Sequence, residues 1–330
     1  MAEDRLLVYS GRCTQIRTLH FSSAAGLAGY DSLFWADSEK RLLLFCRRRP
    51  YSNNPAEEQM SILDKFKLTG RVALVTGGNR GLGRQMAQAL AEAGAQVALT
   101  SREQERAELA AGEIAQSISV AAGDQDSSRT ADRPASVRGY ACDVSDTEQS
   151  AQVVQRVIAD FGGLHVLVNN AGINIRGPIE EIEPEEFQRV IATNTTGVWN
   201  ICRAAAAHLK AQRYGRVINV GSTLSIIALP ERTPYASSKG AVWQMTRVLA
   251  LEWAPYNITV NAMLPGPFAT EMNTPLREDP EEYRKFIARI PLGRWGELDE
   301  IGGLAVFLAS DASSYMTGAG ITIDGGWTVH

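Results

Sequence analysis

The sequence has few of the residues that mark disulfide frameworks, metal sites and membrane spans. Its 330 residues include four cysteines and four histidines, with no C-x-x-C pair and no zinc-like Cys/His spacing. No metal is therefore expected, and the sparse cysteines predict a reducing, cytoplasmic environment. No apolar run approaches the ~18 residues of a membrane span, and the first residues lack the pattern of a secretory signal.

An excess of positive charge is also missing. The chain has 33 lysines and arginines against 37 aspartates and glutamates, a net charge of −4. No global basic field would hold nucleic acid or an anionic membrane, so neither is expected as a partner. The hydrophobic fraction of 45% is that of a globular protein and excludes wholesale disorder.

Two segments of the chain differ in pattern. Residues 1–59 show neither a period of 2 nor one of 3.6, and they predict an irregular N-terminal extension. We expect this extension to be dispensable and to stem from an upstream start codon; a transit peptide is the alternative. Residues 60–330 alternate short apolar runs with helical patterns and predict one domain.

The alternation predicts an α/β fold, a single doubly wound parallel sheet of about seven strands of the Rossmann type. The polar stretch Ser117–Arg138 predicts an extended loop. The expected strands are Val72–Thr76, Gln96–Thr100, Val137–Cys142, Val166–Asn169, Arg216–Val220, Ile258–Met263 and Gly320–Ile323. The expected helices are Leu82–Ala93, Gln104–Gln116, Thr147–Asp160, Pro184–Lys210 with a break near Gly197, Tyr235–Trp253 and Asp299–Leu308.

A glycine-rich turn, T-G-G-N-R-G-L-G over Thr76–Gly83, lies between the first strand and the first helix. Glycine lets the backbone turn sharply and approach a pyrophosphate, and the helix start presents unpaired N–H groups. The turn therefore predicts a dinucleotide site, whose expected members are Gly77, Asn79, Arg80, Gly81, Leu82 and Gly83.

The second strand ends in Ser101 and Arg102, where NAD sites usually place a carboxylate for the ribose 2′-hydroxyl. A guanidinium can instead pair with a 2′-phosphate, and Arg80 would add a second positive charge. These residues favour NADP(H), with NAD as the alternative.

Tyr235 and Lys239 are four residues apart and share one face of an expected helix. A free tyrosine titrates near pH 10, and a nearby ammonium should lower its pKa toward the range useful for acid–base catalysis. Ser222 follows the fifth strand, at the same carboxyl edge of the sheet as the glycine-rich turn. The three residues predict a proton-exchanging site beside the cofactor.

Together these motifs resemble the classical short-chain dehydrogenases/reductases over Leu68–Gly326. The resemblance rests on Thr76–Gly83, Asn169–Gly172, Asn194, Ser222, the Tyr235/Lys239 pair and Pro265–Thr270.

The resemblance implies roles for individual residues. Tyr235 would be the general acid/base, and Lys239 its pKa partner and a contact to the nicotinamide ribose. Ser222 would bind the substrate oxygen, and Asn194 would hold a water linked to Lys239. Further implied cofactor contacts are Asp143 and Val144 at the adenine, Asn169, Ala171 and Gly172 beneath the cofactor, and Pro265, Gly266, Phe268 and Thr270 at the nicotinamide.

The family resemblance also implies a homotetramer, built through the C-terminal strand and the Tyr/Lys helix, which carries Trp243, Met245 and Leu249. Phe268–Arg289 and the segment around Trp295 are expected to form a mobile lid over the substrate.

The stretch Leu68–Glu186 most resembles the gluconate 5-dehydrogenase branch of the family, which implies a sugar-acid or polyol substrate. Arg176 is a candidate for the substrate carboxylate. The alternatives are a 3-oxoacyl-carrier-protein reductase and a non-catalytic cofactor-binding protein. His165, where many relatives carry aspartate, is expected to alter only a hydrogen bond at a strand entry.

Overall fold

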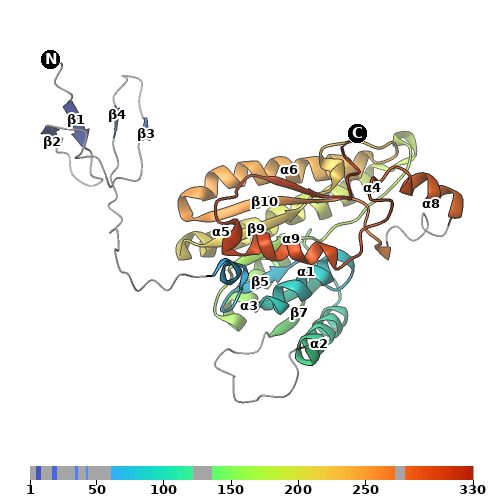
Figure 1. Ribbon diagram of the computed structural model, residues 1–330, viewed down its shortest axis with the longest axis horizontal. Helices are drawn as coiled ribbons and strands as arrows, with labels where there is room; N and C mark the ends of the chain where they lie inside the picture. The colour runs from blue at the N-terminus through green and yellow to red at the C-terminus, as the bar shows by residue number, and fades with distance from the viewer. Residues whose placement is uncertain are drawn as a thin grey trace. The chain divides into compact units, whose positions relative to one another are not determined.

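The computed structural model describes residues 61–121, 136–271 and 279–329, and the backbone of four short strands before residue 60. The chain divides into two compact units, Met1–Met60 and Ser61–His330 (Figure 1). In the first unit, two antiparallel pairs form, β1 (Arg5–Val8) with β2 (Arg17–His20) and β3 (Phe34–Trp35) with β4 (Leu42–Leu43). The rest of the expected extension, residues 122–135 of the expected loop and residues 272–278 of the expected lid lie outside the described residues.

The second unit is built on a seven-stranded sheet, which confirms the predicted fold class. The strand order is β11-β10-β9-β8-β5-β6-β7, and each neighbouring pair is parallel. The winding reverses between β5 and β8, so a crevice for ligands is expected at the carboxyl ends of these two strands. The strands are β5 (Val72–Val75), β6 (Gln96–Ser101), β7 (Val137–Ala141), β8 (Val166–Asn169), β9 (Gly215–Val220), β10 (Ile258–Pro265) and β11 (Gly320–Ile323).

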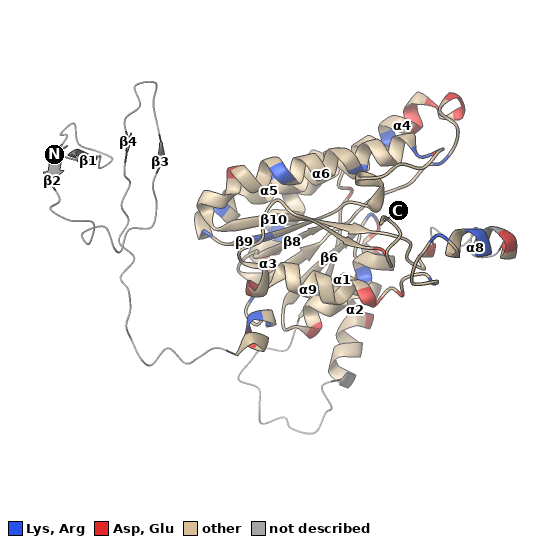
Figure 2. Ribbon diagram, turned by 45° about the horizontal axis from the view of Figure 1, so that its top comes forward, with Lys and Arg blue, Asp and Glu red and all other residues tan. Residues whose placement is uncertain are grey.

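Helices cover both faces of the sheet (Figure 1). Ala73 and Val75 pack in one core with α1, α2 and α9, whereas Val72 and Leu74 pack in the other with α3, α5 and α6. Successive side chains of a strand point to opposite faces, and both faces are apolar here because both are covered. Charged residues accordingly lie mostly on helices and loops (Figure 2). The helices are α1 (Gly81–Glu92), α2 (Gln104–Ala121), α3 (Thr147–Phe161), α4 (Pro184–Ile191), α5 (Gly197–Gln212), α6 (Thr233–Trp253), α8 (Pro280–Ile287) and α9 (Glu300–Ala309).

The loop expected from Ser117 is wrong at its start, because α2 continues to Ala121. The serines fit the helix because their hydroxyls bond back along it. Ser117 donates to the Ile114 carbonyl at 2.8 Å, and Ser119 donates to the Ala115 carbonyl at 3.0 Å.

The expected break near Gly197 is confirmed. A π-helical turn, η4 (Ala192–Thr196), separates α4 from α5. Gly197 packs against Val144, since a Cβ at this glycine would lie 2.6 Å from Val144 Cγ2. Such turns often mark functional sites, and this one holds Asn194.

His165 acts at a strand entry, as expected. Its Nδ1 accepts a hydrogen bond from the Val72 N–H at 3.0 Å, at the start of the paired strands β5 and β8. Among the described residues, no helix combines the length and the hydropathy needed to cross a bilayer, and no group of His, Cys, Asp and Glu is arranged for a metal ion.

Candidate active site

The glycine-rich turn after β5 is fastened to the end of β8. Thr76 Oγ1 accepts hydrogen bonds from the backbone N–H groups of Asn170 at 3.0 Å and Ala171 at 3.1 Å. Asn170 Nδ2 donates in return to the carbonyl oxygens of Thr76 and Gly77, both at 3.0 Å. The expected cofactor floor, which also includes the buried Asn169 and the exposed Gly172, therefore meets the turn at the reversal point of the sheet.

Two glycines of this turn have opposite surroundings. A Cβ at Gly83 would lie 2.3 Å from both Asn170 Nδ2 and Gly77 O, so no side chain fits there. Gly81 has a φ of +55°, and a Cβ there would meet only the Thr270 methyl group, at 4.0 Å. Helix α1 begins at Gly81 without a side-chain cap, so no side chain competes for its first N–H groups. This open, donor-rich turn fits a phosphate.

The residues expected at the adenosine end follow β6 and β7. Ser101 is buried, and its Oγ accepts from the Glu103 N–H at 3.4 Å, whereas Arg102 is exposed. Arg80 is exposed as well, and its Nη1 pairs with Glu271 at 3.0 Å. Asp143 Oδ1 accepts from the Ser145 N–H and hydroxyl at 2.9 and 2.6 Å, while Val144 is buried and Asn79 and Leu82 are partly buried.

Ser222, Tyr235 and Lys239 meet where β9 ends and α6 begins. Ser222 Oγ accepts from the Leu224 N–H at 3.1 Å. Lys239 is buried, and its Nζ donates to the Val220 carbonyl at 2.6 Å. The same Nζ lies 5.7 Å from the centre of the Tyr235 ring. The structure thus brings the three predicted residues together.

The protonation of this trio differs from the prediction. Burial raises the pKa of Tyr235, opposed by a hydrogen bond with Ser222 and by the charge of Arg176. The expected lowering of the Tyr235 pKa is therefore wrong. The reason is desolvation, which disfavours both ionised forms and also lowers the pKa of Lys239 to about 8.

Asn194 ties the loop after β8 to α6. Its Oδ1 accepts from the Ile173 N–H at 2.8 Å, and its Nδ2 donates to the Ile173 carbonyl at 2.9 Å and to Ser238 Oγ at 3.0 Å. Ser238 Oγ donates in turn to the Tyr235 carbonyl at 2.7 Å. Both N–H donors of the Asn194 amide are therefore engaged, which leaves its Oδ1 able to accept one further hydrogen bond.

The segment expected at the nicotinamide leaves β10 at Pro265. Gly266 is pressed against Asp324, since a Cβ at Gly266 would lie 2.4 Å from Asp324 Cβ. Phe268 is buried against Gly296, and Thr270 donates its N–H to the Phe268 carbonyl at 2.8 Å. These contacts hold the segment at the carboxyl edge of the sheet.

Comparisons with known proteins agree with this geometry. A family model described as enoyl-(acyl carrier protein) reductase matches residues 77–328. The 2-dehydro-3-deoxy-D-gluconate 5-dehydrogenase of Pseudoalteromonas atlantica is 38% identical over 266 residues, covering 81% of this chain and 99% of that protein. The 3-oxoacyl-[acyl-carrier-protein] reductase FabG of Thermotoga maritima is 36% identical over 264 residues, covering 80% and 100%.

A solved structure is similar as well. The crystal structure of a gluconate 5-dehydrogenase from Burkholderia cenocepacia, in complex with NADP and tartrate, has a TM-score of 0.75 and 36% identity, covering 82% of this chain and 100% of that one. The chain belongs to the short-chain dehydrogenase/reductase family.

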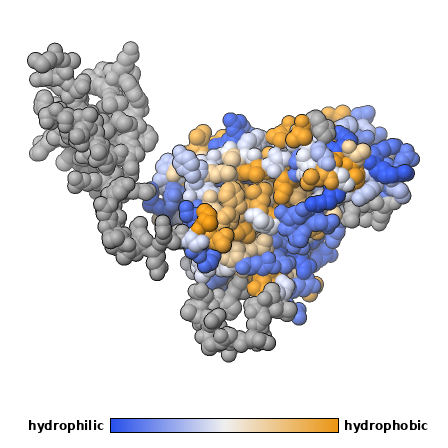
Figure 3. Space-filling model, in the orientation of Figure 1, coloured by the Kyte–Doolittle hydropathy of each residue, from blue (hydrophilic) through white to orange (hydrophobic). Residues whose placement is uncertain are grey.

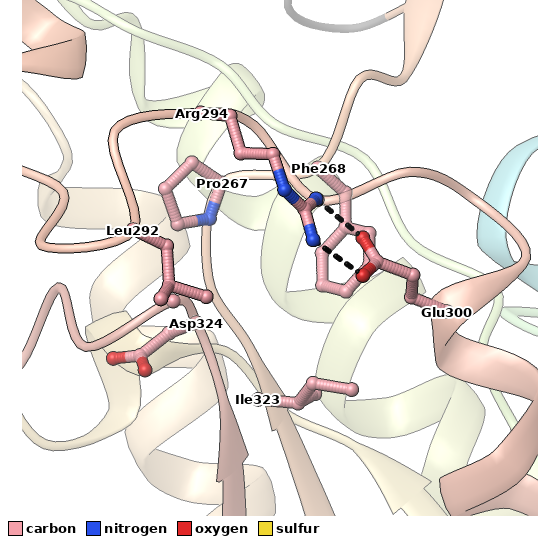
Figure 4. A pocket seen from close by; sticks show the side chains of 9 residues that line it. Pro267, Phe268, Leu292, Arg294, Glu300, Ile323 and Asp324 are labelled. Carbon is pink, nitrogen blue, oxygen red and sulfur yellow. Dashed lines mark hydrogen bonds and ion pairs between the residues drawn. The ribbon is translucent and has the colours of Figure 1, made fainter.

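In this short-chain dehydrogenase/reductase, a cavity of about 220 Å³ lies behind the nicotinamide segment (Figure 4). Pro267, Phe268 and Asp324 line it, and Arg294 crosses its mouth in a two-pronged ion pair with Glu300, both contacts at 2.7 Å. Ser222, Tyr235 and Lys239 do not line this cavity, but Phe268 of the segment expected at the nicotinamide does.

Sequence reasoning missed several residues around Tyr235. Ser225 Oγ accepts from the Ser222 N–H at 3.2 Å and donates to the Lys239 carbonyl at 2.9 Å, a bridge that only its spacing from Ser222 could have suggested. Trp327 belongs to an apolar cluster with Tyr235, joined by Phe286 of the expected lid. The ring of Phe286 also stacks on that of Trp295, with 4.8 Å between the ring centres, and Trp295 is buried.

Proposed function

We propose that the chain is an NADP(H)-dependent oxidoreductase that interconverts a secondary alcohol and a ketone on a sugar acid. One observation carries this proposal: Ser222, Tyr235 and Lys239 converge at the carboxyl edge of the sheet. The glycine-rich turn lies at the same edge, and the helix that follows it has no side-chain cap. The sugar-acid relatives named above support the choice of substrate class.

The residues of the turn suit a dinucleotide. When bound, NADP(H) would accept a hydride from the reacting carbon of the substrate or donate one to it. Gly81 and the first turn of α1 would hold its pyrophosphate, and Ser101, Arg102 and Arg80 its 2′-phosphate. Arg80 would have to leave Glu271 to do so, an exchange that costs little because both side chains are exposed. The other expected contacts are Gly77, Asn79, Leu82, Gly83, Asp143, Val144, Asn169, Ala171, Gly172, Pro265, Gly266, Phe268 and Thr270.

Tyr235 would exchange the proton. Because burial raises its pKa, its phenol is protonated at neutral pH and can donate a proton to the oxygen of a ketone. Ser222 would hydrogen-bond the same oxygen as negative charge develops on it. Lys239, with a pKa of about 8, remains mostly protonated at pH 7 and would stabilise the tyrosinate left behind.

A second candidate is a 3-oxoacyl-carrier-protein reductase. It is supported by the acyl-carrier description of the family model and by the Thermotoga maritima relative. Arg176 favours the sugar acid, because its charge reaches Tyr235 and can meet a carboxylate. A cofactor-binding protein without turnover is disfavoured, since the complete catalytic set is assembled.

We also propose that the protein forms a homotetramer and that it is located in the cytoplasm. Met245 and Leu249, expected at a subunit seam, are partly buried against the core and keep part of their surface for such a seam. Leu251 of α6 and Trp199 of α5 are exposed at 80% and 48% and would supply the contact. Hydrophobic residues also gather over β10 and α9, beside the edge strand β11 (Figure 3). Sedimentation at micromolar concentration tests the tetramer, and a monomer would contradict it.

The deciding experiment follows nicotinamide absorbance with both cofactors against sugar acids, polyols, 3-oxoacyl thioesters and simple ketones. Turnover of 5-ketogluconate or gluconate with NADP(H) is expected. Tyr235→Phe should abolish turnover and preserve cofactor binding, because only the proton-exchanging hydroxyl is lost. Activity confined to acyl thioesters would move the assignment to the second candidate.

A further inference from the structure

Two loops that border the active site are joined by one carbonyl oxygen. The loop after β8 carries Arg176 and Gly177, and the loop before α6 carries Glu231 and Arg232. The Glu231 carbonyl accepts from the Gly177 N–H at 3.2 Å and from Arg232 Nη1 at 2.9 Å. The guanidinium of Arg232 therefore sits against the loop that bears Arg176.

Arg232 is also one helical turn before the catalytic tyrosine. It is the residue before α6, and Tyr235 lies three positions later, on the same side of the first turn. The Arg232 side chain is only 19% exposed, so its charge is largely withdrawn from the solvent. Burial lowers the pKa of Arg232, and the charge of Arg176 lowers it further. Burial raises the pKa of Tyr235, and the charge of Arg176 opposes that rise, so Arg176 lies within electrostatic reach of both groups.

Several features of this arrangement are unfavourable without an anion. A cation at a helix N-terminus opposes the helix dipole, and two guanidinium groups repel each other. Glu231 adopts a φ of +60°, a left-handed conformation that a residue with a side chain rarely adopts. Its carboxylate approaches Arg232 no closer than 3.9 Å. A strained backbone conformation close to charges that repel each other is typical of a ligand-binding site.

We infer that Arg232 is a specificity-determining residue that binds the substrate carboxylate together with Arg176 and selects acidic substrates over neutral ones. This inference rests on the proposed function and deepens it. Guanidinium groups bind carboxylates through paired, charge-assisted hydrogen bonds, and two of them bracket one carboxylate more tightly than one alone.

The first test is binding without turnover. Tartrate is titrated into the NADP⁺-loaded protein by calorimetry, for the wild type, Arg232→Gln, Arg232→Lys and Arg247→Gln. Arg247 is an exposed arginine farther along α6 and controls for the lost charge. We expect Arg232→Gln to weaken tartrate about tenfold or more, Arg232→Lys to restore part of the loss, and Arg247→Gln to stay within about twofold. Equal affinities for Arg232→Gln and Arg247→Gln would overturn the inference.

The second test compares an acidic and a neutral substrate. With 5-ketogluconate, Arg232→Gln should raise KM about tenfold or more and change kcat little, whereas KM for a neutral six-carbon ketose should not rise. Equal losses on both substrates would show a merely structural role and overturn the inference.

The two tests separate this inference from the proposed function. Tartrate binding that depends on Arg232, in a protein that reduces no sugar acid, would support the anion site and refute the substrate. Reduction of 5-ketogluconate that is unaffected by Arg232→Gln would support the substrate and refute the anion site.

Discussion

Replacing Lys239 with methionine should make the cofactor-free protein more stable at neutral pH while abolishing turnover. The ammonium is buried and has one hydrogen-bond partner in the described structure, the Val220 carbonyl. Burial lowers its pKa from 10.5 to about 8, so the folded state binds this proton less tightly than the unfolded chain does. Methionine keeps the apolar stem and removes the charge.

The magnitude follows from the pKa shift. One pKa unit corresponds to about 1.4 kcal/mol, so the charged lysine costs about 3 kcal/mol of unfolding free energy at pH 7. Loss of the bond to the Val220 carbonyl offsets about 1 kcal/mol, which leaves an expected gain of about 2 kcal/mol. The cost is fully present below the folded pKa of about 8 and disappears as the pH rises toward the unfolded value of 10.5. The stability difference between variant and wild type should therefore shrink between pH 8 and 10.

Urea unfolding of both proteins from pH 7 to 10, at one fixed protein concentration, measures this difference. Lys65→Met removes an exposed lysine and serves as the control; its difference from wild type should not follow this trend. A Lys239→Met protein less stable than wild type at pH 7, or a difference that does not change with pH, would refute the reasoning.

Three further substitutions test other parts of the site. Gly83→Ala would force a methyl group onto Asn170 Nδ2, 2.3 Å away, and should weaken NADPH binding about tenfold or more in a fluorescence titration. Arg102→Ala should weaken NADPH about tenfold and NADH little, measured as the ratio of dissociation constants; equal losses would mean another role. Ser225→Ala removes the acceptor for the Ser222 N–H and should lower kcat about tenfold with KM nearly unchanged in steady-state assays, and a change in KM alone would contradict this.

The regular part of the fold follows from local patterns. Most of the strands are rich in apolar residues. The expected bounds agree with the observed ones at β8 and β11 and differ by at most two residues elsewhere, as at β10, which extends to Pro265. Helix α6 begins at Thr233, two residues before the expected start, because Pro234 suits the first turn of a helix. Spacing alone also brought Ser222, Tyr235 and Lys239 together, since the carboxyl ends of parallel strands share one edge.

What the sequence could not predict depends on contacts between distant segments. The protonation of Tyr235 depends on how deeply the apolar cluster with Trp327 buries it, and no spacing encodes burial. Ser225 and Arg232 are ordinary polar residues in sequence. Their positions become informative only when the loops before α6 and after β8 are folded against each other.

Several features near Tyr235 are energetically unfavourable, and sequence reasoning predicted only some of them. The π turn at Asn194, the left-handed Glu231 and the buried Lys239 each cost stability on their own. Local propensity predicts the conformation of lowest free energy for each isolated segment. The prediction fails where contacts with distant residues hold a segment in another conformation. The sheet, buried on both faces, can bear these costs because its two apolar cores are large. Strain beside the Tyr235 hydroxyl is therefore itself an argument that this hydroxyl is where the chemistry takes place.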